Sequence, residues 1–196
     1  MWKRCLPMFI VFLLAGCGGS KAPHMIIPDY TKKAARLIAL MPVDNRTNDQ
    51  LAPKMLREKI LEELYFKGYP KIPLDVIDGR LKKTYAVGIN SQAGNISPKA
   101  IGALLEVDAV MYCTLIESKT AIRLFYAPTS VSASCELRSA ETGETLWRAR
   151  SSIVERMAGY SNHNLEMKAS QVYESAIQEV VNKVMETLPD GAELSG

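Results

Sequence analysis

Histidine is scarce in this 196-residue chain, which holds only His24 and His163. Neither has a second potential ligand at metal-binding spacing. The sequence contains no H-E-x-x-H, C-x-x-C, G-x-S-x-G or G-x-x-x-x-G-K-[ST] motif. These absences argue against a zinc enzyme, a Ser-His-Asp hydrolase and a P-loop nucleotidase. We therefore expect no catalytic residues, no metal and no cofactor.

Long hydrophobic runs are also lacking. The apolar segment Leu6–Leu14, interrupted by Pro7, is shorter than the ~20 residues that a membrane-spanning helix needs. Lys3 and Arg4 precede it and L-A-G-C, ending at Cys17, follows it. A basic start, a short apolar core and small residues before a cleavage site predict a signal peptide over residues 1–16.

The L-A-G-C sequence resembles the lipobox of bacterial lipoproteins. The resemblance implies that Cys17 carries a diacylglyceryl thioether and is then acylated at its amine, so that its partner is membrane lipid. Two or three chains hold a protein more firmly than the marginal anchor of one. Gly18, where Asp would signal inner-membrane retention, implies a periplasm-facing anchor on the outer membrane, with surface exposure left open. The alternative is an ordinary signal peptide with an incidental cysteine.

Charge is nearly balanced. The formal net charge is +3, and two of these charges are Lys3 and Arg4. This balance gives no reason to expect nucleic acid as a partner. Removal of 16 residues leaves 180, and a hydrophobic share of 47% supports one packed domain. We expect a lipidated, flexible tether over residues 17–34, a domain over residues 35–189 and a disordered tail over residues 190–196.

The first half of the domain alternates strands and helices. Residues 36–43 form a continuous apolar run, which predicts a central strand covered on both faces. Residues 50–67 have helical apolar spacing, with a cap at Asn48 or Asp49 and an end at Gly68. Residues 69–78 hold two prolines and predict a strand near a sheet edge.

The second half predicts an antiparallel meander followed by a long helix. A short helix begins at Ser97-Pro98, and the long strand after it bends near residues 118–120. A hairpin turns at Gly143, and residues 164–188 carry a broad apolar helical stripe. The fold class is α/β, a single domain with a mixed β-sheet, an antiparallel meander and packed helices.

One strand alternates cleanly between apolar and polar residues. Val131, Ala133, Cys135 and Leu137 face one way, and serines and charged residues face the other way. One face is therefore buried, and the other meets water or a partner. Cys113 and Cys135 sit at the apolar phase of neighbouring strands. We favour two separate buried thiols and leave a disulfide as the alternative, because no register follows from the sequence.

Two segments are candidate binding sites. The loop Asp44, Asn45, Arg46, Thr47 and Asn48 follows a strand and opens a helix, where crevices and exposed amides lie in α/β sheets. It is a candidate site for a charged ligand. The favoured alternative is a capping turn with solvated charges.

Phe125, Tyr126 and Pro128 cluster at a predicted hairpin tip. Aromatic side chains are enriched in protein interfaces, so these residues are a candidate partner surface. The alternative is that they close over the end of the sheet.

Three stretches together carry a family resemblance: RLIALMPVDNRTND, LLEVDAVMYCTLIE and SAETGETLWRAR, followed by a long C-terminal helix. They resemble the small bacterial lipoproteins typified by a neisserial genome-derived surface antigen. The same elements are more loosely similar to the curli secretion channel lipoprotein, the penicillin-binding-protein activator lipoproteins and the TolB amino-terminal domain.

The resemblance implies a TolB amino-terminal-domain-like fold and a non-catalytic subunit or accessory factor of an envelope or secretion assembly. The implied partners are envelope proteins, including a curli-channel-like lipoprotein, or further copies of this chain. The family supplies no catalytic residues. The alternative function is a periplasmic small-ligand-binding or enzymatic domain that uses the loop 44–48.

Overall fold

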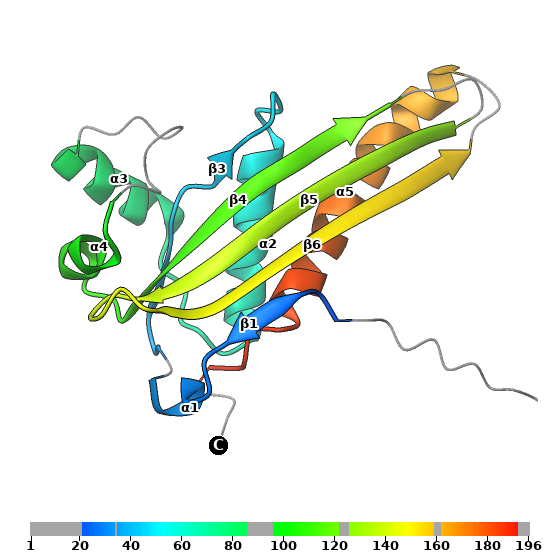
Figure 1. The fold of residues 1–196 in the computed structure, drawn as a ribbon. Helices are drawn as coiled ribbons and strands as arrows, with labels where there is room; N and C mark the ends of the chain where they lie inside the picture. The colour runs from blue at the N-terminus through cyan, green and yellow to red at the C-terminus, as the bar shows by residue number, and fades with distance from the viewer. Residues whose placement is uncertain (1–20, 34, 86–95, 122–125, 159–161, 192–196) are drawn as a thin grey trace, which may run out of the picture.

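The computed structural model describes residues 21–33, 35–85, 96–121, 126–158 and 162–191. In these ranges the chain builds a mixed sheet of six strands in the order β1-β6-β5-β4-β2, with β3 also paired to β4 (Figure 1). The strands are β1 His24–Ile26, β2 Ile38–Leu40, β3 Asp44–Asn45, β4 Ala109–Thr120, β5 Tyr126–Ser139 and β6 Thr145–Ala158. The helices are α1 Tyr30–Lys33, α2 Ala52–Phe66, α3 Leu74–Tyr85, α4 Pro98–Leu105 and α5 Asn162–Met185. The expected α/β class, with a mixed sheet in one domain, is confirmed.

Strands β4, β5 and β6 form the antiparallel meander. The turn between β5 and β6 places Gly143 at φ 77°, a conformation that glycine adopts without steric cost. The register of β4 against β5 shifts between Leu115 and Glu117. This irregularity lies just before the segment where the sequence predicted a bend.

Strand β2 lies at the edge of the sheet and pairs only with β4 among the described strands, so the expected central position is wrong. It is nevertheless buried on both faces, as its apolar run predicted. Ile38 and Leu40 enter the main core, and Ala39 enters a second cluster beneath α3 and α4. Helices, rather than neighbouring strands, bury this edge.

The strand expected at residues 69–78 is also wrong, because α3 begins at Leu74. Pro73 ends an extended segment, and its carbonyl accepts the backbone N–H of Ile77 (3.3 Å). Ile77 and Leu81, one helical turn apart, are buried in the second cluster. The helical spacing of the apolar residues after the prolines therefore indicates the local structure better than the prolines themselves do. The cap of α4 is as expected, since Ser97 Oγ accepts the Ala100 N–H at 3.3 Å.

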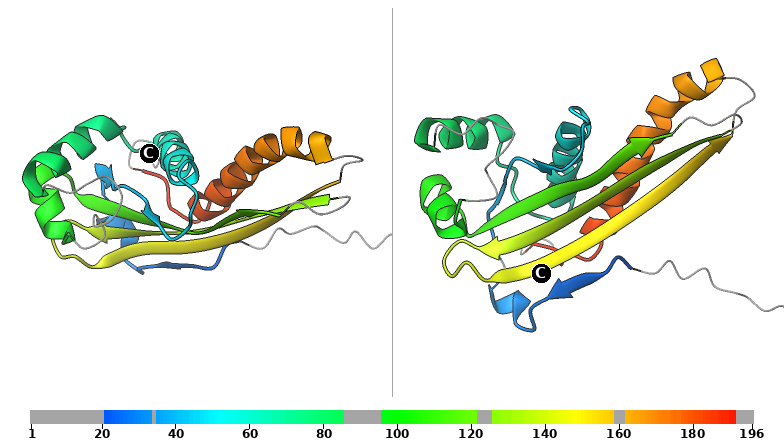
Figure 2. Two further views of the ribbon diagram at one scale, coloured as in Figure 1. Left: turned by 90° about the horizontal axis from the view of Figure 1, so that it is seen from above. Right: turned by 45° about the horizontal axis from the view of Figure 1, so that its top comes forward.

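Helices α2 and α5 lie on one face of the sheet, and α3 and α4 lie at one end (Figure 2). The main core fills the space between the sheet and α2 and α5. Its largest side chain is Trp147 of β6, whose Nε1 donates to Thr187 Oγ1 at 3.1 Å. This indole, buried with its N–H satisfied, joins β6 to the segment that follows α5.

The domain begins earlier than residue 35, which corrects the expected tether. Strand β1 pairs with β6, and Pro23 O accepts the backbone N–H of Arg150 at 3.1 Å. Tyr30 is buried, and its hydroxyl lies 3.0 Å from that of Tyr69. Burial raises the pKa of Tyr30 above its ordinary value. At the other end Gly191 is buried and donates to Lys67 O, so part of the expected tail also belongs to the domain.

Candidate functional site

The loop after β3 is held together by its own side chains. Asn45 Oδ1 accepts the backbone N–H and the hydroxyl of Thr47 at 3.0 and 2.8 Å. Asn45 Nδ2 donates to Asp49 O at 2.7 Å, and the Asp49 N–H donates to Thr47 Oγ1 at 3.1 Å. These bonds occupy the polar groups of Asn45 and Thr47 within the turn. They agree with the alternative that the loop is a capping turn.

Asp49 connects this turn to three other elements. Its Oδ1 accepts the backbone N–H groups of Leu51 and Ala52, which start α2. Its Oδ2 accepts the hydroxyls of Ser118 from β4 and Tyr173 from α5. Burial alone would raise the pKa of Asp49, but these hydrogen bonds outweigh it and hold the pKa below its ordinary value. The carboxylate is thus a structural junction.

The charged residues of the loop are exposed and pair with each other. The Arg46 side chain is 67% exposed and pairs with Asp44 at 3.2 Å. A cavity of about 560 Å³ lies beside the loop, and of the five candidate residues only Asn45 and Thr47 line it. Asp44, Arg46 and Asn48 are outside its lining, and the ligand role of Asp44 and Arg46 stays a prediction.

The cavity is instead marked by a buried ion pair. Arg57 of α2 has a side chain only 8% exposed, and its guanidinium bonds both carboxylate oxygens of Asp78 from α3 at 2.8 Å. It also donates to Leu40 O at 2.9 Å, while its Nε is buried without a partner among the described residues. Lys54 adds a second cation to the lining. Sequence reasoning missed this pair because residues 69–78 were assigned to a strand. The sequence signal for this buried ion pair was Arg57 itself, which lies next to Leu56 and three residues before Ile60, two positions of the apolar face of the helix.

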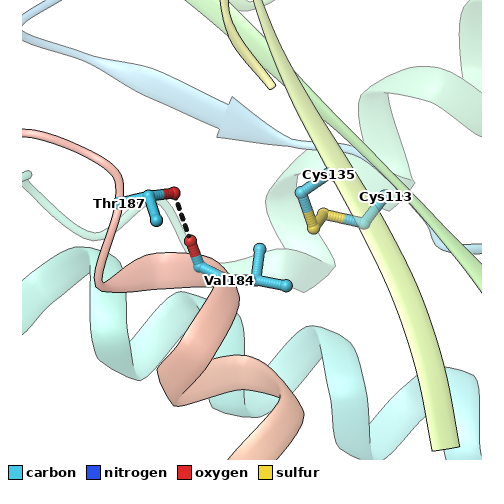
Figure 3. The surroundings of a disulfide bond; sticks show 4 residues. All are labelled: Cys113, Cys135, Val184 and Thr187. Carbon is cyan, nitrogen blue, oxygen red and sulfur yellow. Dashed lines mark hydrogen bonds between the residues drawn. A yellow bond between two sulfur atoms is a disulfide. The ribbon is translucent and has the colours of Figure 1, made fainter. Parts of the chain in front are cut away.

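Cys113 and Cys135 are directly opposite in the register of β4 and β5, with their Cα atoms 4.1 Å apart. The structure joins them by a disulfide, which corrects the preference for two separate thiols. Figure 3 shows the disulfide on the side of the sheet that faces the end of α5, near Val184. A close cross-strand pair of this kind brings two side chains within bonding reach, but only the register reveals it.

Of the three predicted partner-surface residues, Phe125 lies outside the described residues. Tyr126 and Pro128 belong to the start of β5, opposite Ala158 and Arg156 of β6. Whether this end of the sheet contacts a partner stays a prediction.

Two aromatic side chains that sequence reasoning missed are exposed at the end of α2. Tyr65 and Phe66 are 55% and 70% exposed, with ring centroids 6.0 Å apart in an edge-to-face arrangement. Lys71 Nζ lies 4.7 Å from the Tyr65 ring centroid. The sequence signal was that both positions follow the last buried leucine of the helix, Leu64, without a further apolar repeat.

The outward face of β6 carries a row of arginines. Positions 148, 150, 152, 154 and 156 are exposed, and their odd-numbered neighbours turn towards the core. Arg148, Arg150 and Arg156 therefore project on the side away from α5, where no described helix covers β6. The alternation of apolar and polar residues in TLWRARSSIVER is the sequence signal for this row.

Cys17, the predicted lipidation site, lies outside the described residues. No helix in the described ranges combines the length and apolar character that crossing a bilayer requires. The described His, Cys, Asp and Glu side chains form no group of three or more that could hold a metal ion.

The fold defines a small single-domain α/β protein with a mixed sheet. The sequence profile of the family described as "Putative lipoprotein GNA1162-like" matches residues 28–195. The chain therefore belongs to the GNA1162-like lipoprotein family. No curated protein matches the chain.

Solved structures share the fold. Lipoprotein GNA1162 from Neisseria meningitidis is 24% identical, with 71% of this chain and 96% of that chain covered and a TM-score of 0.55. More distant similarity extends to the PelC dodecamer from Paraburkholderia phytofirmans (16% identity, 85% and 94% covered, TM-score 0.45). The LpoB C-terminal domain from Salmonella enterica is 14% identical, with 69% and 86% covered and a TM-score of 0.46. Membership of the lipoprotein family confirms the expected resemblance.

Proposed function

We propose that this protein is anchored to the outer membrane through acylated Cys17, faces the periplasm and serves as a non-catalytic subunit or accessory factor of an envelope or secretion assembly. Family membership supports the lipoprotein character, and the L-A-G-C sequence supports the acylation site. We expect its partner to be another envelope protein in the periplasm, such as a curli-channel-like lipoprotein.

The observation that carries this proposal is the exposed aromatic pair Tyr65–Phe66. Large aromatic side chains bury more apolar surface than most others and are enriched at protein interfaces. Phe66 has no polar atom to satisfy in water, yet 70% of it is exposed. Burial of both rings against a partner would remove this apolar surface from water.

The test is a mild-detergent pull-down of the acylated chain from native membranes after cross-linking. A photoreactive residue at position 66 is expected to capture a specific envelope protein. The same residue at Lys82, exposed on α3, serves as the matched control and should not capture it. Recovery of an uncross-linked monomer from both variants and from wild type would contradict the proposal.

A second candidate function, binding of a small polar ligand with a carboxylate group, is suggested by the cavity beside α2. Lys54 and the partly unsatisfied Arg57 guanidinium line it, together with the carboxylates of Glu58 and Asp78. Binding of a carboxylated ligand should weaken in Lys54→Gln and persist in Arg46→Ala, because Arg46 lies outside the lining. Calorimetry with a panel of small carboxylates would measure this. Equal binding by Lys54→Gln and wild type would exclude the cavity.

A further inference from the structure

The face of the sheet opposite α2 and α5, which α3 and α4 cover only at one end, concentrates positive charge, and it is here called the arginine face. Five cationic side chains and only two anionic ones project from the outward face of β4, β5 and β6: Lys119, Arg138, Arg148, Arg150, Arg156, Glu117 and Glu136. Without Lys3 and Arg4 the whole chain has 22 basic and 21 acidic residues. The arginine face therefore has an excess of three positive charges, and the remainder of the chain has a net negative charge.

Of the three β6 arginines, Arg148 lies opposite Glu136 and interacts electrostatically with its carboxylate, whereas Arg150 and Arg156 lie opposite Ser134 and Pro128 of β5. Glu136 is already bound by Arg138 at 2.7 Å and by the Thr145 hydroxyl. Glu117 accepts from Ser130 at 2.8 Å. Arg148, Arg150 and Arg156 are exposed, and none of them takes part in an ion pair between described residues. Such a cluster attracts an anionic surface.

Two exposed apolar side chains accompany these charges. Met25 of β1 is opposite Arg148 in the register, so the two side chains share a face. Val154 lies on the same strand face, between Arg150 and Arg156. Met25 is 41% exposed and Val154 is 58% exposed. Cations together with apolar side chains are what the headgroup region of a membrane accommodates.

The lipid anchor is close to this face. The chain is held from Pro23 onwards, because Pro23 O accepts the backbone N–H of Arg150 itself. Five residues lie between Cys17 and Pro23, and the six steps from one Cα atom to the next span about 20 Å when fully extended. The bilayer that holds Cys17 therefore lies within that distance of the middle of the arginine row.

From this placement we infer that the arginine face docks on the anionic phospholipid headgroups of the membrane in which Cys17 is anchored. The inference rests on the proposed acylation of Cys17. Lipid is favoured over a protein occupant because the anchor tethers the face beside a bilayer. Each basic residue near an anionic leaflet contributes about fivefold to association, so the three β6 arginines favour this orientation by about a hundredfold.

The test uses the mature, acylated chain in vesicles of phosphatidylethanolamine and phosphatidylglycerol. A nitroxide is attached at Val154→Cys, which provides a free thiol because Cys113 and Cys135 are paired. A second label at Glu62→Cys, exposed on α2, reports the opposite side of the domain. The label at 154 should lose most of its accessibility to an aqueous relaxation agent, whereas the label at 62 should stay accessible.

Charge variants identify the cause of any protection. The triple variant Arg148→Gln/Arg150→Gln/Arg156→Gln should restore access at position 154, as should vesicles of phosphatidylcholine alone or high salt. A control triple variant at three exposed helix lysines, Lys82→Gln/Lys83→Gln/Lys99→Gln, should leave the protection unchanged.

Two readouts separate this inference from the anchor on which it depends. Mass spectrometry of the acyl chains and flotation with vesicles test the anchor. A chain that is acylated and floats, but whose label at 154 remains as accessible as in water, overturns the docking. Equal protection at 154 in detergent or neutral vesicles shows that a protein, including a second copy of this chain, covers the face, and it also overturns the docking.

Discussion

The disulfide between Cys113 and Cys135 makes a sharp prediction about stability. The perturbation is the double substitution Cys113→Ala/Cys135→Ala, or reduction of the wild-type protein. The cross-link closes a loop with a sequence separation of 22. In the chain-entropy treatment such a loop stabilises the folded state by about 3.4 kcal/mol at 25 °C, because it restricts the unfolded chain.

The assay is equilibrium unfolding in urea at neutral pH, with and without a phosphine reductant. With a slope of about 2–3 kcal/mol/M, loss of the cross-link should lower the midpoint by more than about 1 M. The reductant should leave the midpoint of the double variant unchanged. A loss below about 1 kcal/mol, or two reactive thiols in the denatured wild type, would refute the reasoning.

Three further predictions concern single positions. Asp78→Asn should lower the free energy of unfolding in urea by about 2–4 kcal/mol, because it leaves the buried Arg57 charge without a counter-ion. The double variant Arg57→Met/Asp78→Leu should recover at least half of this loss. No recovery would argue against the ion pair. Gly102→Ala should destabilise the protein by about 1–3 kcal/mol, because the new Cβ would lie 2.4 Å from the Cβ of Ala140. Gly79→Ala, where the new Cβ meets open space, should stabilise α3 by about 0.5–1 kcal/mol. Because the pKa of Asp49 is lowered in the folded state, its contribution to stability is present above the unfolded pKa of about 3.9 and is lost as pH falls through the folded pKa. The variant Asp49→Ala should therefore be less stable than wild type at pH 7 and should lose less stability on acidification. An acid-unfolding profile equal to that of wild type would contradict this.

Features with a local cause could be predicted from the sequence. The β5–β6 hairpin follows from alternation and a glycine at positive φ, and the α4 cap follows from Ser97 and Pro98. The helix α2 follows from its apolar spacing and ends before Gly68, whose φ is 80°. Each signal lies within a few residues of the structure that it specifies.

Features that depend on distant partners could not be predicted in this way. Strand β1 is three residues long and none of its side chains enters the core, so its backbone pairing with β6 defines it. The edge position of β2 depends on the order of the strands, which its own residues do not encode. Residues 69–78 contained both prolines and helical spacing, and the burial of Ile77 beneath the sheet decided between them.

The candidate site shows the same division. The loop 44–48 could be located from the sequence, because the end of a strand and the start of a helix are adjacent in the chain, and two of its residues line a cavity. The buried ion pair of the cavity, Arg57 and Asp78, comes from two helices, and the two residues are 21 positions apart in the sequence. A wrong strand assignment for residues 69–78 was enough to hide that pairing.

The arginine face and the aromatic pair lie on opposite sides of the sheet, and this separation yields a final prediction. Helix α2 packs its buried residues on the core side of the sheet, and the exposed Tyr65 and Phe66 lie at the end of this helix. Docking of the arginine face on lipid therefore leaves the aromatic pair available to a protein. Cross-linking from position 66 should retain the same partner in Arg148→Gln/Arg150→Gln/Arg156→Gln, because the anchor keeps the protein at the membrane, although the yield should fall as the domain loses its orientation. Complete loss of the partner in that variant, with acylation and folding intact, would mean that the arginines bind the partner directly and that the two surfaces are one interface.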